Sequence, residues 1–297
     1  MASEVTPGIP IVVVVGPTGV GKTKVALELA EARNGELIGA DSVQVYRGFD
    51  IGASKPSTEE LRGIPHHLID VRDPEDTLDA ASFAQLADAA IRDVAARGRL
   101  PIVVGGTGLW IRALLRGLVD APKVDPELRA KLEADWEREG ALAMHHRLSE
   151  IDPLTAQRVH WNDKLRVVRA LEVHAQTGKP LGQLRADHAL GRPRYDDHTI
   201  LLDLEPAHHA ERIRARTRAM IELGLIAEVE AIVQRHGETV RALQSVGYKQ
   251  VVQHLRAPVA VEELEKQIQR ATHLYARRQR TWWKNDPGVK ERRGGAR

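Results

Sequence analysis

A glycine-rich run at residues 16–23 is the clearest chemical feature of the chain. It reads Gly-Pro-Thr-Gly-Val-Gly-Lys-Thr and matches the pattern G-x-x-x-x-G-K-[ST] in full. Glycines let backbone amides surround an anion, and the start of a following helix adds a positive dipole end. Lys22 would add a point charge, and the Thr23 hydroxyl could hold a magnesium ion between phosphates. The run predicts a diphosphate or triphosphate site formed by Gly16, Pro17, Thr18, Gly19, Val20, Gly21, Lys22 and Thr23.

The phosphate chain need not belong to a nucleotide that the protein hydrolyses. GTPases carry an Asn-Lys-x-Asp segment that reads the base, and the sequence contains none. ATPases usually place an acidic residue at the end of an apolar strand to help hold magnesium. Here the apolar run 101–104 ends in Gly-Gly-Thr-Gly instead, which disfavours ordinary ATP hydrolysis. A small-molecule kinase, a nucleic-acid-dependent ATPase and a noncatalytic RNA-binding protein remain as alternatives for the same loop.

Polar residues follow two further apolar runs. Asp41, Ser42, Val43 and Gln44 come directly after residues 36–40, and Thr107 follows residues 101–104. Parallel strands present their carboxyl ends to the ligand crevice, so Asp41 should face the phosphate loop. A carboxylate there can accept a proton from an amine or a hydroxyl. Ser42 and Gln44 can hydrogen-bond a planar ligand edge, and Thr107 can donate to a phosphate. The structural alternatives are a turn cap at Asp41 and a plain glycine-rich turn at Thr107.

Arginines are prominent in the last third of the chain. Arg212 and Arg216 lie four residues apart, so on a helix they share a face and could clamp a diphosphate. A solvated helix surface is the alternative. Further cations lie near Trp282 and Trp283, a mixture that suits RNA backbone contacts and base stacking, although both tryptophans could equally pack in a core. The formal net charge of +2 does not by itself indicate nucleic-acid binding.

Alternating apolar segments must position these residues. The β-branched run 11–15 predicts a buried parallel strand before the phosphate loop, and a helix over 24–33 follows it. Further strands are expected at 36–40, 101–104 and 199–204, and helices over 82–97, capped by Ser82, and over 109–116. Helices over 207–223, 226–235 and 261–283 come next, and the tail after residue 287 should be frayed. This alternation predicts an α/β fold, a parallel sheet flanked by helices.

The pattern changes at about residue 120. Residues 125–177 are typical of helices, with breaks at Pro153 and at Asn162-Asp163. Residues 179–197 are rich in glycine, proline and charge, which is typical of a loop. We therefore expect a catalytic core formed by residues 1–120 and 198–297, including the C-terminal helices. A mostly helical insertion domain should occupy residues 121–197.

The composition limits the class of protein. The chain has 297 residues, of which 42% are apolar and 28% charged, as in globular proteins. The absence of cysteine excludes disulfides and thiolate metal sites and suits a reducing compartment. No apolar run is long enough to span a membrane, and no basic segment followed by an apolar stretch opens the chain. We expect a cytoplasmic monomer that does not contact a membrane.

Together these motifs resemble the bacterial tRNA dimethylallyltransferase family, also called isopentenyl-diphosphate:tRNA transferases. The resemblance rests on the phosphate loop, on Asp41-Ser-Val-Gln-Val-Tyr-Arg47, and on the segments 51–56, 65–70 and 105–107. It continues through 166–172, 245–248 and 277–282, so that it covers nearly the whole chain. One such string is weak, but this many in order are specific, and they disfavour the kinase, ATPase and RNA-binding alternatives.

The resemblance implies a P-loop NTPase-like core with a helical insertion. It also implies transfer of a dimethylallyl group from dimethylallyl diphosphate to the exocyclic amine of the adenosine 3′ of the anticodon, in tRNAs that read codons beginning with U. The adenine would have to leave its stack to react. Asp41 would take the amine proton and Thr107 would position the reacting groups. Magnesium on Thr23, with Lys22, Arg212 and Arg216, would bind the leaving diphosphate.

The same resemblance implies contacts with the tRNA anticodon stem-loop. They would come from the polar segment after the second strand, from the insertion and from the last helices. The residues are Asp41, Ser42, Val43, Gln44, Thr107, Arg129, Leu165, Arg166, Val167, Val168, Arg169, Gln244, Gly247, Tyr248, Lys249, Arg277, Arg278 and Gln279. Gln44 and Ser42 would read the edge of the flipped base.

Overall fold

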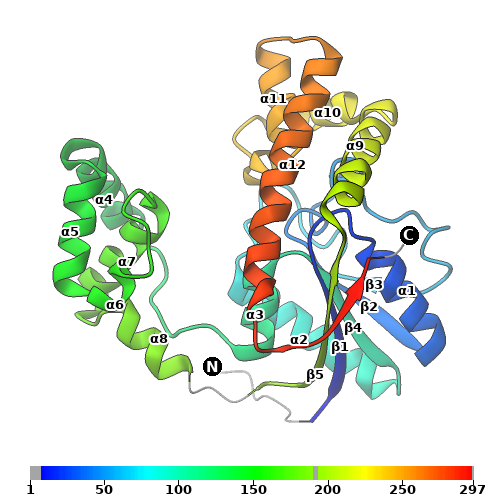
Figure 1. Cartoon of the computed structure of the whole chain (residues 1–297), viewed down its shortest axis with the longest axis horizontal. Coiled ribbons are helices and arrows are strands. Elements are labelled where there is room, and N and C mark those ends of the chain that lie inside the picture. Colours follow the sequence, from blue (N-terminus) through cyan, green and yellow to red (C-terminus); the bar gives the residue numbers. More distant parts are fainter. Residues whose placement is uncertain (1–7, 190–192, 296–297) are drawn as a thin grey trace. The chain divides into compact units, whose positions relative to one another are not determined.

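The computed structural model describes residues 8–189 and 193–295 (Figure 1). Contacts between residues divide the chain into two compact units. The first unit comprises residues 1–115 and 193–297, and the second comprises residues 116–192. None of the helices in the described ranges combines the length and the apolar composition that crossing a bilayer requires.

A parallel sheet of six strands forms the centre of the first unit. The strands are β1 (Pro10–Val15), β2 (Gly35–Ala40), β3 (His66–His67), β4 (Leu100–Gly105), β5 (Asp196–Asp203) and β6 (Val289–Gly294), in the order β3-β2-β4-β1-β5-β6. The β-branched residues of β1 suit a strand that is covered on both faces, and all but its first residue are buried. The predicted α/β fold with a parallel sheet is confirmed.

Helices cover both faces of this sheet. On one face Val12 and Val14 pack with the buried residues of α1 (Lys22–Arg33). On the other face Val13 and Val15 belong to a larger cluster that includes α2 (Ala80–Ala96) and α3 (Gly108–Arg116). Because side chains alternate along a strand, successive valines of β1 enter opposite cores. The strand is thereby fixed from both sides, and so is the start of the loop that follows it.

The C-terminal helices follow β5 in the first unit. They are α9 (Pro206–Glu222), α10 (Leu225–His236), α11 (Tyr248–Arg256) and α12 (Val261–Lys284), with the short 3-10 helix η1 (Arg241–Gln244) before α11. Helices α9 and α12 pack side by side and extend beyond the carboxyl edge of the sheet (Figure 1). The buried residues of α12 recur every three or four positions, as on one helix face, from Leu264 through Ile268 to Trp283.

The second unit is helical and has its own apolar core. Its helices are α4 (Pro126–Glu139), α5 (Ala141–Ile151), α6 (Pro153–Ala156), α7 (Lys164–Thr177) and α8 (Leu181–Ala189). Asp125, Asp152 and Asp163 accept hydrogen bonds from backbone N–H groups at the starts of α4, α6 and α7. The core includes Met144 and Leu148.

Several local sequence predictions are wrong. Helix α2 begins at Ala80, and its N-cap is Asp79 rather than Ser82, whose backbone N–H donates to the Asp79 carboxylate at 2.7 Å. The predicted loop over 179–197 contains α8 and the first residues of β5, while residues 190–192 lie outside the described part of the chain. The predicted frayed tail forms β6, which pairs with β5. The elements β3, η1 and α11, and the break at Gly140, were not predicted.

Tertiary contacts explain these differences. Leu181 of α8 is buried in the core of the second unit, so packing stabilises a helix in a segment whose composition is typical of a loop. Strand β6 is largely charged and lies at the sheet edge, where backbone pairing suffices and charged side chains can face solvent. Such contacts with distant segments leave little periodic pattern in the local sequence.

Glu36 of β2 is a buried charge that joins three elements of the first unit. Its side chain is 1% exposed. Its carboxylate accepts a hydrogen bond from Arg97, at the end of α2, at 2.7 Å and contacts His67 of β3 at 2.7 Å. These contacts, chiefly the one with Arg97, lower the pKa of Glu36 to about 2, so the side chain stays ionised in the folded protein.

Replacing Glu36 with alanine should lower the free energy of unfolding by about 2 kcal/mol at pH 7, because it removes the charged hydrogen bonds between this buried carboxylate and the arginine and histidine beside it. The carboxylate contributes stability above its ordinary pKa of 4.5, and this contribution is lost as the pH falls toward 2. Wild type and variant should therefore converge in acid. Urea unfolding measures the difference.

Glu31→Ala is the matched control, because Glu31 forms an exposed ion pair with Arg62. This control should cost less than about 1 kcal/mol. Equal losses in the two variants, or a difference at Glu36 that does not change with pH, would contradict the role assigned to burial.

Candidate active site

The phosphate loop, residues 16–23, connects β1 to α1. Lys22 is the first residue of α1, and Gly21 before it has φ of 87°, a left-handed conformation that glycine adopts without strain. The first turn of α1 contains no acidic residue, so no carboxylate of this turn competes for the positive end of the helix. Strand, loop and helix follow one another as the motif predicts, and the helix start is available to an anion.

Two C-terminal helices hold the phosphate loop. Gln279 of α12 accepts a hydrogen bond from the backbone N–H of Thr18 at 2.8 Å and donates to the carbonyl of Gly106 at 3.0 Å. His209 of α9 contacts the Thr18 carbonyl through Nε2 at 2.8 Å, and Arg280 donates to its Nδ1 at 3.0 Å. Because arginine can only donate, Nε2 must carry the proton. Burial lowers the pKa of His209, which favours this neutral form.

The loop faces a cavity of about 590 Å³ at the carboxyl ends of the strands. The wall comes from the phosphate loop, from residues after β2, from the end of β4, from a loop before β3 and from α9. Nine of the residues that the sequence singled out line it: Thr18, Gly19, Gly21, Lys22, Thr23, Asp41, Gln44, Arg212 and Arg216. The fold thus brings three separate sequence signals to one place.

Two cations and a carboxylate set the electrostatics of this cavity. Burial lowers the pKa of Lys22 to about 8; the negative charge of Asp41 opposes this shift, and the positive charge of Arg216 adds to it. Burial also lowers the pKa of Arg216, again against the influence of Asp41. The ammonium of Lys22 donates to the carbonyl of Pro17 at 2.9 Å. The cations are therefore partly desolvated and only partly neutralised, as a polyanion site requires.

Asp41 follows β2 and has one oxygen engaged in the backbone. Its Oδ1 accepts hydrogen bonds from the N–H groups of Val43 at 2.9 Å and Gln44 at 3.3 Å. Its Oδ2 makes no hydrogen bond with any described residue. The turn cap that the sequence left open is therefore present, and it leaves one carboxylate oxygen for a ligand. The Asp41 charge also adds to burial in raising the pKa of Tyr275 on α12 to about 12.

Thr107 and Ser42 lie beside the cavity rather than on its wall. The backbone N–H of Ser42 donates to the Thr107 hydroxyl at 3.2 Å, and the two side-chain oxygens are 3.5 Å apart. Val43 packs against the apolar core. Thr107 thus joins the end of β4 to the segment after β2 and helps to fix the position of Asp41.

The cavity residues that received no role from the sequence include Ala53, Ser54, Glu60 and His66. Neither ring nitrogen of His66 has a hydrogen-bond partner among the described residues. Burial and the neighbouring His67 lower the pKa of His66 to about 4, so its ring is neutral at pH 7. Ala53, Ser54 and His66 lie in the segments 51–56 and 65–70, which contribute to the family resemblance. The resemblance therefore marks these segments, but it assigns no chemical role to the three residues.

The C-terminal residues expected to contact tRNA differ in exposure. Tyr248 is 1% exposed and Gln279 is 7% exposed, and each makes hydrogen bonds within the first unit. Gly247 is buried and precedes α11 with φ of 94°. The remaining residues are exposed: Gln244, Lys249, Arg277 and Arg278. Tyr248 and Gln279 therefore hold other parts of the protein in place, whereas the exposed residues remain available to a partner.

The insertion residues divide in the same way within the second unit. Arg129 and Arg169 bind the buried carboxylate of Glu172 at 2.5 and 2.7 Å, and Arg169 also donates to the carbonyl of Pro122. Val167 and Val168 lie in the apolar core of the unit. The exposed residues of the set are Leu165 and Arg166. A motif identifies positions but not the direction in which each side chain points.

Comparison with known proteins places these features in one family. The sequence model described as IPP transferase matches residues 44–286. A tRNA dimethylallyltransferase from Anaeromyxobacter dehalogenans is 48% identical over 279 residues, which is 94% of this chain and 93% of the relative.

Solved structures agree. A full-length tRNA isopentenylpyrophosphate transferase from Bacillus halodurans superposes with a TM-score of 0.70 and 39% identity, covering 96% of this chain and 90% of that one. A eukaryotic dimethylallyltransferase acting on tRNA gives a TM-score of 0.76 at 28% identity, over 92% of this chain and 69% of that one. The resemblance seen in the sequence is confirmed along nearly the whole chain, and this protein belongs to the tRNA dimethylallyltransferase family.

Proposed function

We propose that this chain transfers the dimethylallyl group of dimethylallyl diphosphate to the exocyclic amine of an adenosine in tRNA and releases diphosphate. The acceptor is the adenosine 3′ of the anticodon in tRNAs that read codons beginning with U. The observation that carries this proposal is the cavity in which Lys22, Arg216 and Asp41 meet. It combines an anion site with a carboxylate, as a leaving diphosphate and a proton-losing amine require.

The leaving group sets the first requirement. As the allylic C–O bond breaks, its electron pair leaves with the diphosphate, and negative charge develops there. Lys22, Arg212 and Arg216 line the cavity and would bind this charge together with the amides of the phosphate loop. Since Lys22 and Arg216 are already desolvated by the protein, little solvent reorganisation is needed around them during the reaction.

The acceptor sets the second requirement. An adenine amine is a weak nucleophile, and it must lose a proton as its nitrogen bonds to the allylic carbon. The unengaged oxygen of Asp41 would accept that proton. Thr107 would act through Ser42 and the turn that carries Asp41, because its hydroxyl is bonded to that segment. The adenine must leave the anticodon stack to enter the cavity.

Magnesium fits the donors that the cavity offers. Thr23 lines the wall directly after Lys22. No group of three His, Cys, Asp or Glu residues that could hold a metal ion occurs in the described ranges. Magnesium is commonly held by one or two protein oxygens together with phosphates and waters, so Thr23 would hold it with the diphosphate. The bound ion would neutralise charge on the leaving group.

Exposed cations on both units would contact the anticodon stem-loop. Arg277 and Arg278 in the first unit and Arg166 in the second have exposed side chains. Guanidinium groups suit phosphate contacts. We assign residues 121–197 to an insertion domain that contacts tRNA, and residues 1–120 and 198–297 to the catalytic core. An enzyme with this substrate would act in the cytoplasm, and we propose that it does so as a monomer.

The direct test of this function is a transfer assay. The pure protein is incubated with dimethylallyl diphosphate, magnesium and a tRNA that carries adenosine 3′ of its anticodon, and the digested nucleosides are analysed by mass. We expect adenosine that has gained one dimethylallyl group, and none when magnesium is chelated. Labelled ATP in place of the prenyl donor should transfer no phosphate. Phosphate transfer without prenylation would favour a kinase instead.

Replacing Asp41 with asparagine should lower kcat by about 10²- to 10⁴-fold, because the amide cannot accept the amine proton. The asparagine oxygen can still accept the N–H groups of Val43 and Gln44, so the turn is preserved. Calorimetric binding of inorganic pyrophosphate should be no weaker than in the wild type, since a repulsive charge is removed. Wild-type turnover would exclude Asp41 as the proton acceptor, and lost pyrophosphate binding would point to misfolding of the site.

Pyrophosphate affinity should fall about tenfold between pH 7 and pH 9, because Lys22, with a pKa of about 8 in the free protein, loses its charge. The affinity falls rather than rises with pH because the anion binds the protonated form of the Lys22 amine. Pyrophosphate itself gains negative charge over this range, which acts in the opposite direction. Lys22→Arg, which stays charged, provides the control and should show no such decrease. The same pH dependence in both proteins would exclude Lys22 as its origin.

A further inference from the structure

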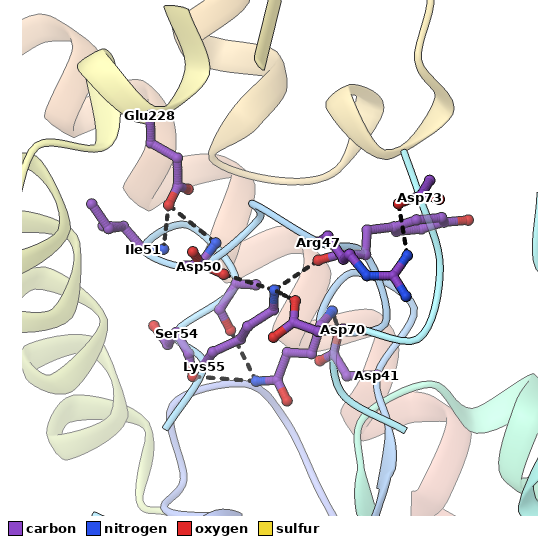
Figure 2. A network of polar contacts seen from close by, with 12 residues as sticks. Asp41, Arg47, Asp50, Ile51, Ser54, Lys55, Asp70, Asp73 and Glu228 are labelled. Carbon is purple, nitrogen blue, oxygen red and sulfur yellow. Dashed lines mark hydrogen bonds and ion pairs between the residues drawn. The ribbon is translucent and has the colours of Figure 1, made fainter. Parts of the chain in front are cut away.

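Glu228 of α10 binds a loop that forms part of the cavity wall. Its carboxylate accepts hydrogen bonds from three consecutive backbone N–H groups, those of Asp50 at 3.0 Å, Ile51 at 2.6 Å and Gly52 at 3.1 Å. Figure 2 shows Glu228 on one side of this loop and Lys55 on the other. Hydrogen bonds to a charged acceptor are strong, so the loop is attached firmly to the C-terminal helices.

Tyr248 of α11 extends this contact by one residue. Its hydroxyl donates to Glu228 at 2.7 Å and accepts the N–H of Ala53 at 3.1 Å. Its ring lies so close to Gly52 that a Cβ there would be 2.5 Å from two ring carbons. Burial and the charge of Glu228 raise the pKa of Tyr248, so the phenol keeps its proton. Two side chains therefore satisfy the four N–H groups of residues 50–53.

Lys55 fixes the far end of the same loop. Its side chain is 8% exposed, and its ammonium donates to the carbonyl of Tyr46 at 2.7 Å, to Asp50 at 2.7 Å and to Asp70 at 2.5 Å. An ammonium has three hydrogens, and all three have acceptors. The loop between Asp50 and Lys55 is thus held at both ends (Figure 2).

The held loop in turn orients the amide of Gln44. The Nε2 of Gln44 donates to the carbonyls of Ala53 at 3.0 Å and Ser54 at 3.2 Å, which uses both amide hydrogens. Rotating the amide would place its oxygen against two carbonyl oxygens, so the orientation is defined by its partners. The Oε1 has no hydrogen-bond partner in the described part of the chain, and Gln44 lines the cavity. Gln44 therefore offers the ligand an acceptor and no donor.

We propose that Glu228 and Tyr248 are positioning residues for base selection, because they hold the loop that turns the Gln44 oxygen toward the cavity. This inference rests on the proposed function. An exocyclic amine has two hydrogens: Asp41 takes one as a proton, and Gln44 accepts the other as a hydrogen bond. In a base with an oxygen at the same position, that oxygen would face the Gln44 oxygen, and two hydrogen-bond acceptors repel each other. The arrangement thus selects a 6-amino purine and rejects a 6-oxo purine.

The test compares two anticodon stem-loops that carry adenosine or inosine at the target position. Wild-type protein should bind the adenosine form about tenfold more tightly, the effect of one hydrogen bond exchanged for a repulsive contact. Tyr248→Phe and Glu228→Gln keep the side-chain shapes but weaken the hold on the loop. Both should reduce the preference to below about threefold while leaving pyrophosphate affinity unchanged. A loss of folding alone would lower both affinities together.

Tyr195→Phe is the matched control. Tyr195 is also buried and also donates its phenol to a carboxylate, but that carboxylate is Asp88 of α2 rather than Glu228, which holds the loop of residues 50–53. It should keep the wild-type preference. An unchanged preference in Tyr248→Phe and Glu228→Gln would overturn the proposal, as would a wild-type protein that does not distinguish the two stem-loops. Failure of the proposed function would be distinct, because wild-type protein would then form no prenylated adenosine at all.

Discussion

The desolvation of Lys22 and Arg216 beside Asp41 is the constraint on which the rest of this structure depends. Lys22 and Arg216 share a cavity with Asp41, and burial lowers the pKa of both cations. The charge of Asp41 opposes both shifts without cancelling them, so the desolvation of the two cations is only partly offset by the protein. A diphosphate restores the balance. The same property makes the site suited to a reaction in which negative charge grows on a leaving group.

The fold maintains this arrangement from several directions. Parallel strands bring the phosphate loop and Asp41 to one edge of the sheet, and α9 carries Arg216 on the facing wall. Helices α9 and α12 also fasten the loop itself, through His209 and Gln279. Helices α10 and α11 hold the neighbouring loop through Glu228 and Tyr248. The C-terminal third of the chain thus supplies both charge to the cavity and support for its walls.

The sequence predicts the centre of this site better than its support. The phosphate loop and Asp41 are recognisable because a short buried strand precedes each motif and fixes where it must lie. The direction of a side chain at a motif position depends on packing, so nothing local reveals that Tyr248 is buried or that Arg129 binds Glu172. Strand β6 and helix α8 depend on partners distant in the sequence. The requirement for glycine at position 52 becomes clear only from the structure, in which the ring of Tyr248 leaves no room for a Cβ.

A structure with both substrates in place would show whether the cavity holds a diphosphate beside Lys22 and an adenine beside Asp41. The complex would contain an unreactive thio analogue of dimethylallyl diphosphate and an anticodon stem-loop. We expect the two phosphates to lie against the amides of residues 16–23, in contact with Lys22 and Arg216. We also expect the adenine amine to lie about 2.6–3.2 Å from the carboxylate of Asp41. Phosphates bound elsewhere, or an adenine amine remote from Asp41, would contradict this expectation.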